Sequence, residues 1–199
     1  MRLKNKQKKI AVFLIMLVLF TMDYRINAFA DIKDDVKSST DADGTDKFLI
    51  SDMPEIQGES AIVVDLKTGY TLYEKNITQK LYPASITKIM TATLAIENLL
   101  LTDTVTFSHD AVYTIEPGSS SAYMSEGEQI TVADCLYGLM LISGNDLANG
   151  LAEKVSGSMD GFAAKMTEKA KEIGCINTNF TNAHGLHDEN HYTCAYDMA

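Results

Sequence analysis

Two short groups of polar residues have the types and the spacing for nucleophilic catalysis. In the first group, Ser85 and Lys88 lie three residues apart at the predicted start of a helix, so their side chains share one face. A serine hydroxyl is a weak nucleophile until a base takes its proton, and a partly desolvated lysine amine can be that base. The apolar neighbours Ile86, Ile89 and Met90 are expected to desolvate the amine. Backbone N–H groups at the helix start can polarise the carbonyl under attack.

The second group is Ser143-Gly144-Asn145, which lies between two apolar helical stretches. Taken alone, it fits a turn between helices, and Ser85 alone fits a serine that caps a helix. Taken together and in this order, S-x-x-K followed by S-x-N is typical of penicillin-binding proteins and class A β-lactamases, where a K-T-G motif completes the set. The pair therefore indicates acyl transfer through a serine nucleophile.

The sequence around both motifs resembles that of the serine D-Ala-D-Ala carboxypeptidases, the low-molecular-mass penicillin-binding proteins. The resemblance covers roughly residues 50–199 and is carried by YPASITKIMTATLAIE, LYGLMLISGNDLANGLAE and NTNFTNAHGLHDENHYTCAYDMA. It implies a β-lactamase/transpeptidase-like α/β (α+β) fold, with an antiparallel sheet and a helical subdomain. By this resemblance Ser85 is the acylated nucleophile and Lys88 takes its proton. Ser143 relays a proton towards the leaving amine, and Asn145 holds the substrate.

The resemblance also implies the reaction and the partners. The substrate is the terminal D-Ala-D-Ala bond of a peptidoglycan stem peptide, which is hydrolysed through an acyl-enzyme without a metal or another cofactor. β-Lactam antibiotics would acylate the same serine. A class A-like β-lactamase is the nearest alternative, since it shares the motifs but needs an efficient deacylating base. A wall-binding fragment without activity is the alternative from another class.

One feature departs from the family pattern. The only K-T-G in the chain is Lys67-Thr68-Gly69, which precedes Ser85 and is predicted to be a hairpin turn. In the family this motif lies on a strand well after S-x-N and lines the substrate. We therefore expect the chain to be the N-terminal part of the domain, incomplete at its C-terminus, and inactive by itself. The family's membrane-anchoring segment would also lie beyond residue 199, and membrane association is expected only through it.

A zinc peptidase would act on the same substrate by different chemistry. His184, His187 and His191 lie within eight residues, with Asp188 and Glu189 among them, and imidazoles are common zinc ligands. No H-E-x-x-H motif is present, however, and the resemblance accounts for this segment as a structural loop. The sequence therefore predicts no metal.

The N-terminus indicates export. A basic start, an apolar run at 10–20 and the ending Ala28-Phe29-Ala30 predict a signal peptide over 1–30, and an acidic linker follows at 31–47. The formal charge of −10 becomes −15 in the mature chain, with 11 basic and 26 acidic residues, which argues against nucleic-acid binding. The three cysteines are expected to be small buried side chains, and their disulfide state stays open.

The pattern of apolar residues predicts the elements that must position the motifs. Residues 61–74 read as a β-hairpin and 104–107 as a short strand, while 117–129 is a Gly- and Ser-rich loop. Helices are predicted over 83–99, 131–142 (capped by Thr131), 146–155, 159–173 (ending at Gly174) and from Thr193 onwards. The domain is expected to cover 48–199, with S-x-x-K at a helix start and S-x-N between two helices.

Overall fold

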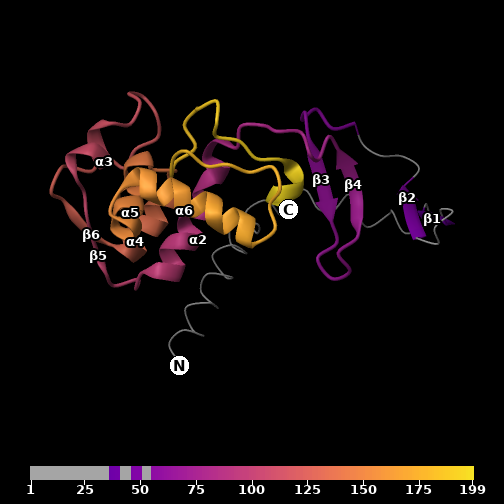
Figure 1. Ribbon diagram of the computed structural model, residues 1–199, viewed down its shortest axis with the longest axis horizontal. Coiled ribbons are helices and arrows are strands. Elements are labelled where there is room, and N and C mark those ends of the chain that lie inside the picture. The colour runs from indigo at the N-terminus through magenta and orange to yellow at the C-terminus, as the bar shows by residue number, and fades with distance from the viewer. Residues whose placement is uncertain (1–35, 41–45, 51–54) are drawn as a thin grey trace. The chain divides into compact units, whose positions relative to one another are not determined.

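The computed structural model describes residues 36–40, 46–50 and 55–199 (Figure 1). The chain divides into two compact units, one ending at Glu74 and the other running from Lys75 to Ala199. The predicted signal peptide at 1–30 lies outside the described residues, as do residues 51–54 at the predicted start of the domain. In the described part of the chain, no helix is both long enough and apolar enough to cross a bilayer.

The first unit holds two separate pairs of strands. Strand β1 (Val36–Thr40) pairs antiparallel with β2 (Asp46–Ile50), with Val36 opposite Ile50. The stretch predicted as a linker at 31–47 thus contains β1 and the start of β2. Backbone hydrogen bonds make such a ladder whatever the side chains are, so a polar, acidic composition did not reveal it.

The second pair in this unit is the predicted hairpin, formed by β3 (Ala61–Val64) and β4 (Thr71–Lys75). The carboxylate of Asp65 accepts hydrogen bonds from the backbone N–H groups of Lys67 and Thr68, both at 2.8 Å. Gly69 follows with φ +75°, which a residue without Cβ adopts at no steric cost. The early K-T-G is therefore a turn, as predicted.

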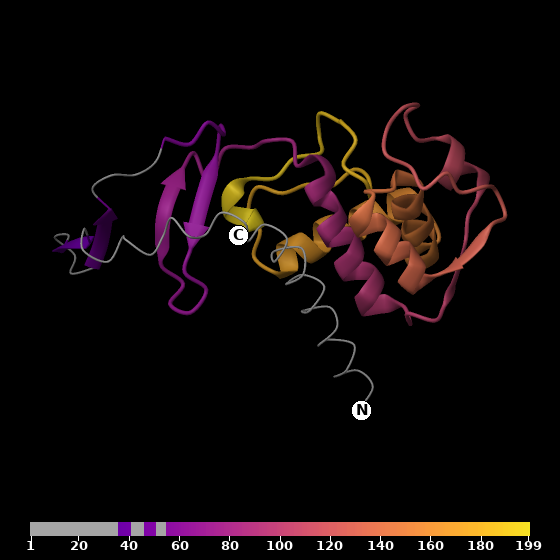
Figure 2. The same cartoon turned by 180° about the vertical axis from the view of Figure 1, so that it is seen from behind.

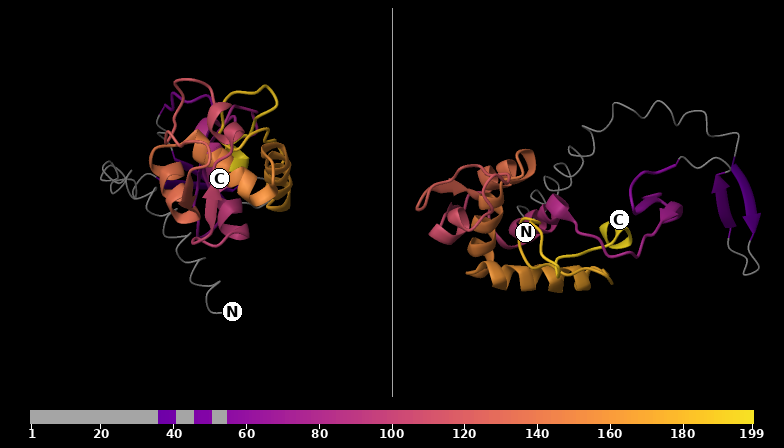
Figure 3. Two further views of the ribbon diagram at one scale, coloured as in Figure 1. Left: turned by 90° about the vertical axis from the view of Figure 1, so that its left-hand side faces the viewer. Right: turned by 90° about the horizontal axis from the view of Figure 1, so that it is seen from above.

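The second unit is mainly helical. Its elements are η3 (Ala84–Ile86), α2 (Thr87–Asn98), β5 (Thr104–Thr106), α3 (His109–Tyr113), β6 (Gln129–Thr131), α4 (Val132–Leu141), α5 (Asn145–Ser156), α6 (Met159–Glu172) and α7 (Ala195–Met198). Helix α5 packs against α2, α3, α4 and α6, and Figures 2 and 3 show these helices gathered around it. Its Leu147, Ala148, Leu151 and Ala152 are almost fully buried, so α5 is the centre of the core.

The predicted elements of this unit are largely confirmed. The Thr131 side chain caps α4 by accepting from the N–H of Asp134 at 3.1 Å, and α6 ends just before Gly174, which has φ +101°. Strand β6 and the short helix α3 were not predicted, because three to five residues carry too little periodicity. The predicted cap of the last helix was wrong by one residue: Cys194 occupies that position, and the Thr193 hydroxyl instead lies 2.9 Å from that of Thr178.

Candidate active site

The two predicted motifs, S-x-x-K and S-x-N, lie next to each other in the structure. Ser85 lies in η3, the 3₁₀ turn that leads into α2, and Ser143 lies between α4 and α5. The Ser143 hydroxyl donates to the Ser85 hydroxyl at 3.0 Å. Both turns contain strained backbone, since Ala84 has φ +49° and Ser143 has φ +59° although neither is glycine. Such conformations persist where surrounding contacts hold them and are frequent at functional sites.

Lys88 is the buried cation of the site. Its side chain lies in the first turn of α2 and the residue is only 2% exposed. The ammonium group donates to Asn145 Oδ1 at 2.7 Å and to the backbone carbonyl of His184 at 2.8 Å. Burial lowers the pKa of Lys88 from 10.5 to about 8, because desolvation disfavours the charged amine. A substantial fraction of neutral amine is therefore available slightly above neutral pH.

The source of this desolvation differs from the prediction. Ile86, Ile89 and Met90 were expected to cover the amine, but Ile86 and Ile89 are each 51% exposed, and Met90 packs against the hydrophobic core. The groups around Lys88 Nζ come instead from α5, through Asn145, and from the segment that contains His184. Sequence neighbours on a helix point in different directions, so burial of one of them does not follow from the apolar character of the next.

Asn145 is fixed on both sides of its carboxamide. While Oδ1 accepts from Lys88, Nδ2 donates to the Ser119 hydroxyl at 3.0 Å. The backbone N–H of Asn145 also donates to the carbonyl of Ser120 at 2.9 Å. One N–H of the carboxamide is left over after these contacts, since a primary amide offers two. The loop at 117–124 thus holds the amide in one orientation.

Hydrogen bonds to Asp146 hold this loop against the start of α5. The residue is fully buried, and its carboxylate accepts from the N–H groups of Ala122 and Leu147 (both 2.9 Å) and of Met124 (3.0 Å), and from the Ser121 hydroxyl (2.8 Å). Four donors satisfy a buried carboxylate well, and its position in the first turn of α5 is favoured by the helix dipole.

The segment at 181–193 supports the other motif. Thr91 donates to the carbonyl of Ala183 at 2.6 Å, and the Thr87 hydroxyl lies 2.7 Å from Nε2 of His191. Gly185 has φ +88°, and a Cβ at this position would lie 1.8 Å from the carbonyl oxygen of Ala84. The backbone next to Ser85 therefore packs directly on this glycine, which no other residue could replace without displacement.

The three histidines considered as zinc ligands do not converge on one point. His191 contacts Thr87, the His187 ring meets that of Tyr82 edge-on at 4.4 Å, and Nδ1 of His184 accepts from the N–H of Leu186 at 3.1 Å. Within the described residues, no group of three or more His, Cys, Asp or Glu side chains has the arrangement of a metal site.

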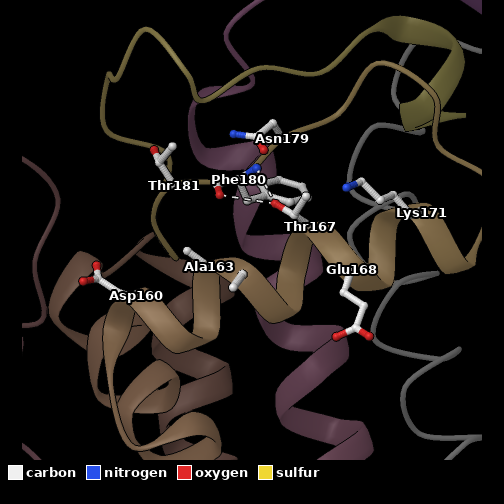
Figure 4. Close-up of a pocket in the computed structure, with 9 residues that line it drawn as sticks. Asp160, Ala163, Thr167, Glu168, Lys171, Asn179, Phe180 and Thr181 are labelled. Atoms are coloured by element: carbon white, nitrogen blue, oxygen red, sulfur yellow. Dashed lines mark hydrogen bonds between the residues drawn. The ribbon is translucent and has the colours of Figure 1, made fainter.

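An open depression of about 510 Å³ lies apart from these motifs, between α6 and residues 179–181 (Figure 4). It is lined by Asp160, Ala163, Ala164, Thr167, Glu168, Lys171, Asn179, Phe180 and Thr181. Thr167 at its centre joins the two walls, because its hydroxyl accepts from the N–H of Phe180 at 2.9 Å. None of the serine, lysine and asparagine side chains of the motifs takes part in it.

Sequence reasoning missed the residues that support the motifs. The sequence placed Ser119 in a loop, Asp146 at a helix start and Gly185 in a structural loop. It suggested His191 only as a metal ligand. The sequence around His191 and Asp146 does not indicate that these side chains are buried. Only Gly185, a glycine in a loop, indicated an unusual backbone conformation.

Comparison with known proteins identifies the family. Residues 47–199 match the family model of D-alanyl-D-alanine carboxypeptidases, peptidase family S11. The chain belongs to this family. It is 43% identical over 148 residues to D-alanyl-D-alanine carboxypeptidase DacF of Bacillus subtilis, covering 72% of this chain and 37% of the relative. It is 39% identical over 154 residues to DacC of Escherichia coli, covering 73% of this chain and 38% of DacC.

Solved structures of the S11 family and its neighbours share the fold. Penicillin-binding protein 5 of Haemophilus influenzae superposes with a TM-score of 0.70 at 36% identity, covering 74% of this chain and 44% of that protein. The transpeptidase of Streptomyces K15 gives a TM-score of 0.68 at 32% identity, covering 73% of this chain and 60% of the other. The β-lactamase/transpeptidase-like fold that the family resemblance implies is thus confirmed. The chain spans less than two fifths of the length of DacF and DacC.

Proposed function

We propose that the whole protein is a serine-type D-Ala-D-Ala carboxypeptidase whose nucleophile is Ser85. The observation that carries the proposal is the buried amine of Lys88, with its pKa lowered to about 8, in the helical turn that follows Ser85. A lysine used only for solubility or surface pairing is exposed and keeps its charge. Membership of the S11 family supports the same reaction.

The proposed reaction has two halves. Ser85 Oγ attacks the carbonyl carbon between two terminal D-alanines, and the neutral amine of Lys88 takes the hydroxyl proton. The C–N bond then breaks, and Ser143, whose hydroxyl lies 3.0 Å from that of Ser85, relays the proton held by Lys88 to the departing amine of D-alanine, so that Lys88 is neutral again. Water hydrolyses the ester and restores the serine. The free N–H of Asn145 would hold the substrate by its amide carbonyl.

The partners and the location follow from the same proposal. The substrate is the stem peptide of peptidoglycan, and β-lactams act as inhibitors by acylating Ser85; the Haemophilus relative bears the name penicillin-binding protein. The signal-peptide pattern at 1–30 supports export to the cell wall or the outer face of the cytoplasmic membrane. Membrane association is proposed only through a segment beyond residue 199.

The test is acylation by a fluorescent penicillin. Full-length protein should retain the label through denaturing electrophoresis and release D-alanine from a stem-peptide mimic, and Ser85→Ala should lose both. Ser125→Ala, at an exposed serine, is the matched control and should keep both. Labelling that survives Ser85→Ala contradicts the proposal. Rapid release of hydrolysed penicillin would instead assign the protein as a β-lactamase.

The same assay addresses the alternative of an inactive wall-binding fragment. The 199-residue chain lacks a K-T-G motif after S-x-N, and this motif supplies one wall of the site in the family. We expect the 199-residue chain to release no D-alanine, because substrate alignment and an oxyanion donor are lost together. Release of D-alanine by this chain would remove the fragment alternative.

A further inference from the structure

The side chain of His191 lies buried beside the proposed nucleophile without reaching it. The residue is 2% exposed, and Nε2 lies 2.7 Å from the hydroxyl of Thr87. Thr87 stands between Ser85 and Lys88 in the S-I-T-K motif and is itself 1% exposed. It is also the first residue of α2, directly after the 3₁₀ turn that carries Ser85. His191 therefore contacts the point where the turn becomes a helix.

The hydrogen bonds of the ring fix its tautomer. Nδ1 accepts from the backbone N–H of Thr181 at 3.1 Å. A main-chain N–H can only donate, so Nδ1 carries no proton and the proton of the neutral ring is on Nε2. Nε2–H then donates to the Thr87 hydroxyl. Burial agrees with a neutral ring, because it lowers the pKa of His191 to about 4.

The ring is anchored at its other end by the helical core. Thr181 adjoins Phe180, whose N–H donates to the hydroxyl of Thr167 in α6 at 2.9 Å (Figure 4). The Phe180 ring also meets the imidazole edge-on, with centroids 5.5 Å apart. A continuous set of contacts thus runs from α6 through residues 180 and 181 and the imidazole to Thr87.

We propose that His191 is a positioning residue for acyl transfer at this site. It holds Thr87, and through Thr87 it sets the place of the Ser85 turn relative to the amine of Lys88. This inference rests on the proposed function, since it concerns the same nucleophile and base. A neutral imidazole suits the task because it offers one donor and one acceptor on opposite sides of a rigid ring, for a hydroxyl on one side and an N–H on the other.

The test compares His191→Gln with His191→Leu in the full-length protein. A glutamine carboxamide also has one acceptor and a donor, whereas leucine leaves the Thr181 N–H and the Thr87 hydroxyl without their partner. We expect His191→Leu to slow acylation by fluorescent penicillin about ten- to a hundredfold and His191→Gln to retain the rate within about fivefold. His187→Leu, in the same segment but without contact to Thr87, is the matched control and should be near wild type.

A double-mutant cycle with Thr87→Val isolates the contact. If His191 acts through Thr87, adding His191→Leu to Thr87→Val should slow acylation less than about threefold further. Independent, multiplying effects would overturn the inference, and so would equal loss in the Gln and Leu variants. If His191→Leu does not fold, the rates of His191→Gln and Thr87→Val still decide, because near-normal rates in Thr87→Val contradict the positioning role.

A measurement on the resting protein separates this inference from the proposed function. The ¹⁵N chemical shifts of His191 in wild-type protein should report a neutral ring with the proton on Nε2 at pH 7. The opposite tautomer, or a charged ring, would overturn the inference whether or not the protein binds penicillin. Absence of wild-type labelling would instead count against the proposed function alone.

Discussion

The two sides of the candidate site are supported by different chemistry. The Ser85 side, with Lys88, is held by the segment at 181–193 through uncharged groups: backbone carbonyls accept from Lys88 and Thr91, and a neutral imidazole donates to Thr87. The Ser143 side, with Asn145, is held through the buried carboxylate of Asp146. Neutral acceptors satisfy the amine without stabilising its charge as a carboxylate would, so burial can lower its pKa. The charged carboxylate of Asp146 lies instead on the Ser143 side, away from the proposed base.

The largest effect is expected from Gly185→Ala, which would displace the backbone on the Ser85 side of the site. The new Cβ would lie 1.8 Å from the carbonyl oxygen of Ala84, so the backbone next to Ser85 must move. We expect penicillin acylation to fall at least about a hundredfold, since small displacements of a nucleophile are costly. Gly157→Ala is the matched control, because its φ of +77° is similar but nothing lies within 4 Å. Equal losses in both variants would show that strain, not contact, matters.

Asn145→Asp would place a carboxylate beside the amine of Lys88, so that the Ser85 side would also have a charged acceptor. In wild type, acylation should rise with pH to a plateau with an apparent pKa near 8, as the amine of Lys88 loses its proton. Asn145→Asp puts a negative charge at the acceptor 2.7 Å from Nζ and should move this profile up by about 1–3 pH units. Stopped-flow acylation between pH 6 and 10 measures both profiles. An unshifted profile would contradict Lys88 as the base.

Loss of the charge on the Ser143 side should have a smaller effect on the reaction. In Asp146→Asn, an amide group faces N–H donors that a carboxylate accepted, and at least one buried donor loses its partner. We expect unfolding to become easier by about 2 kcal/mol and acylation to slow about tenfold. Asp160→Asn is the control, since Asp160 has the same position in the first turn of α6 but is exposed. Equal free energies of unfolding for Asp146→Asn and Asp160→Asn would contradict a stabilising role of the Asp146 carboxylate.

The smallest effect at neutral pH concerns acid stability. Burial lowers the pKa of His184 and His191 from 6.5 to about 4, with Lys88 near His184 and Asp188 near His191 as the charged neighbours. The unfolded state therefore binds more protons between pH 6.5 and 4, and stability is lost as the pH falls through this window. Thermal unfolding should show a lower Tm at pH 5 than at pH 7, with a shallower dependence in His191→Gln. An unchanged slope in that variant would argue against a neutral buried ring.

The fold class could be predicted from the sequence through its resemblance to the penicillin-binding proteins, and solved structures of relatives confirm it, whereas the roles of the four motif side chains stay predictions. The S-x-x-K and S-x-N motifs, together with the periodicity of α2, α4, α5 and α6, predicted which helices would bring Ser85 and Ser143 together. These features are local, and local patterns can be read from a few residues. The β1–β2 pair could not be read in this way, since β1 is mainly polar and its pairing with β2 depends on backbone hydrogen bonds.

The supporting residues were beyond sequence reasoning because their roles depend on contacts between residues far apart in the chain, from 24 residues for Asp146 with Ala122 to 104 for His191 with Thr87. Nothing next to His191 in the chain indicates that its ring meets Thr87, and nothing next to Lys88 reveals that a carbonyl of residue 184 receives its ammonium group. The exposed side chains of Ile86 and Ile89 make the same point: apolar neighbours in sequence did not create the dry environment of the amine. Electrostatic character at a site is a tertiary property.

The separation between Lys88 and its carbonyl acceptor, 96 residues along the chain, has a consequence for when the amine acquires its lowered pKa. During synthesis the chain exposes Ser85 and Lys88 before the carbonyl of His184, which is 96 residues further along than Lys88, and the imidazole of His191 are made. Until then the amine is hydrated and keeps its ordinary pKa near 10.5, so the serine has no base at neutral pH. A nascent chain would therefore carry Ser85 close to a fully charged Lys88, and the lowered pKa of Lys88 would arise only when residues 184–191 pack against α2.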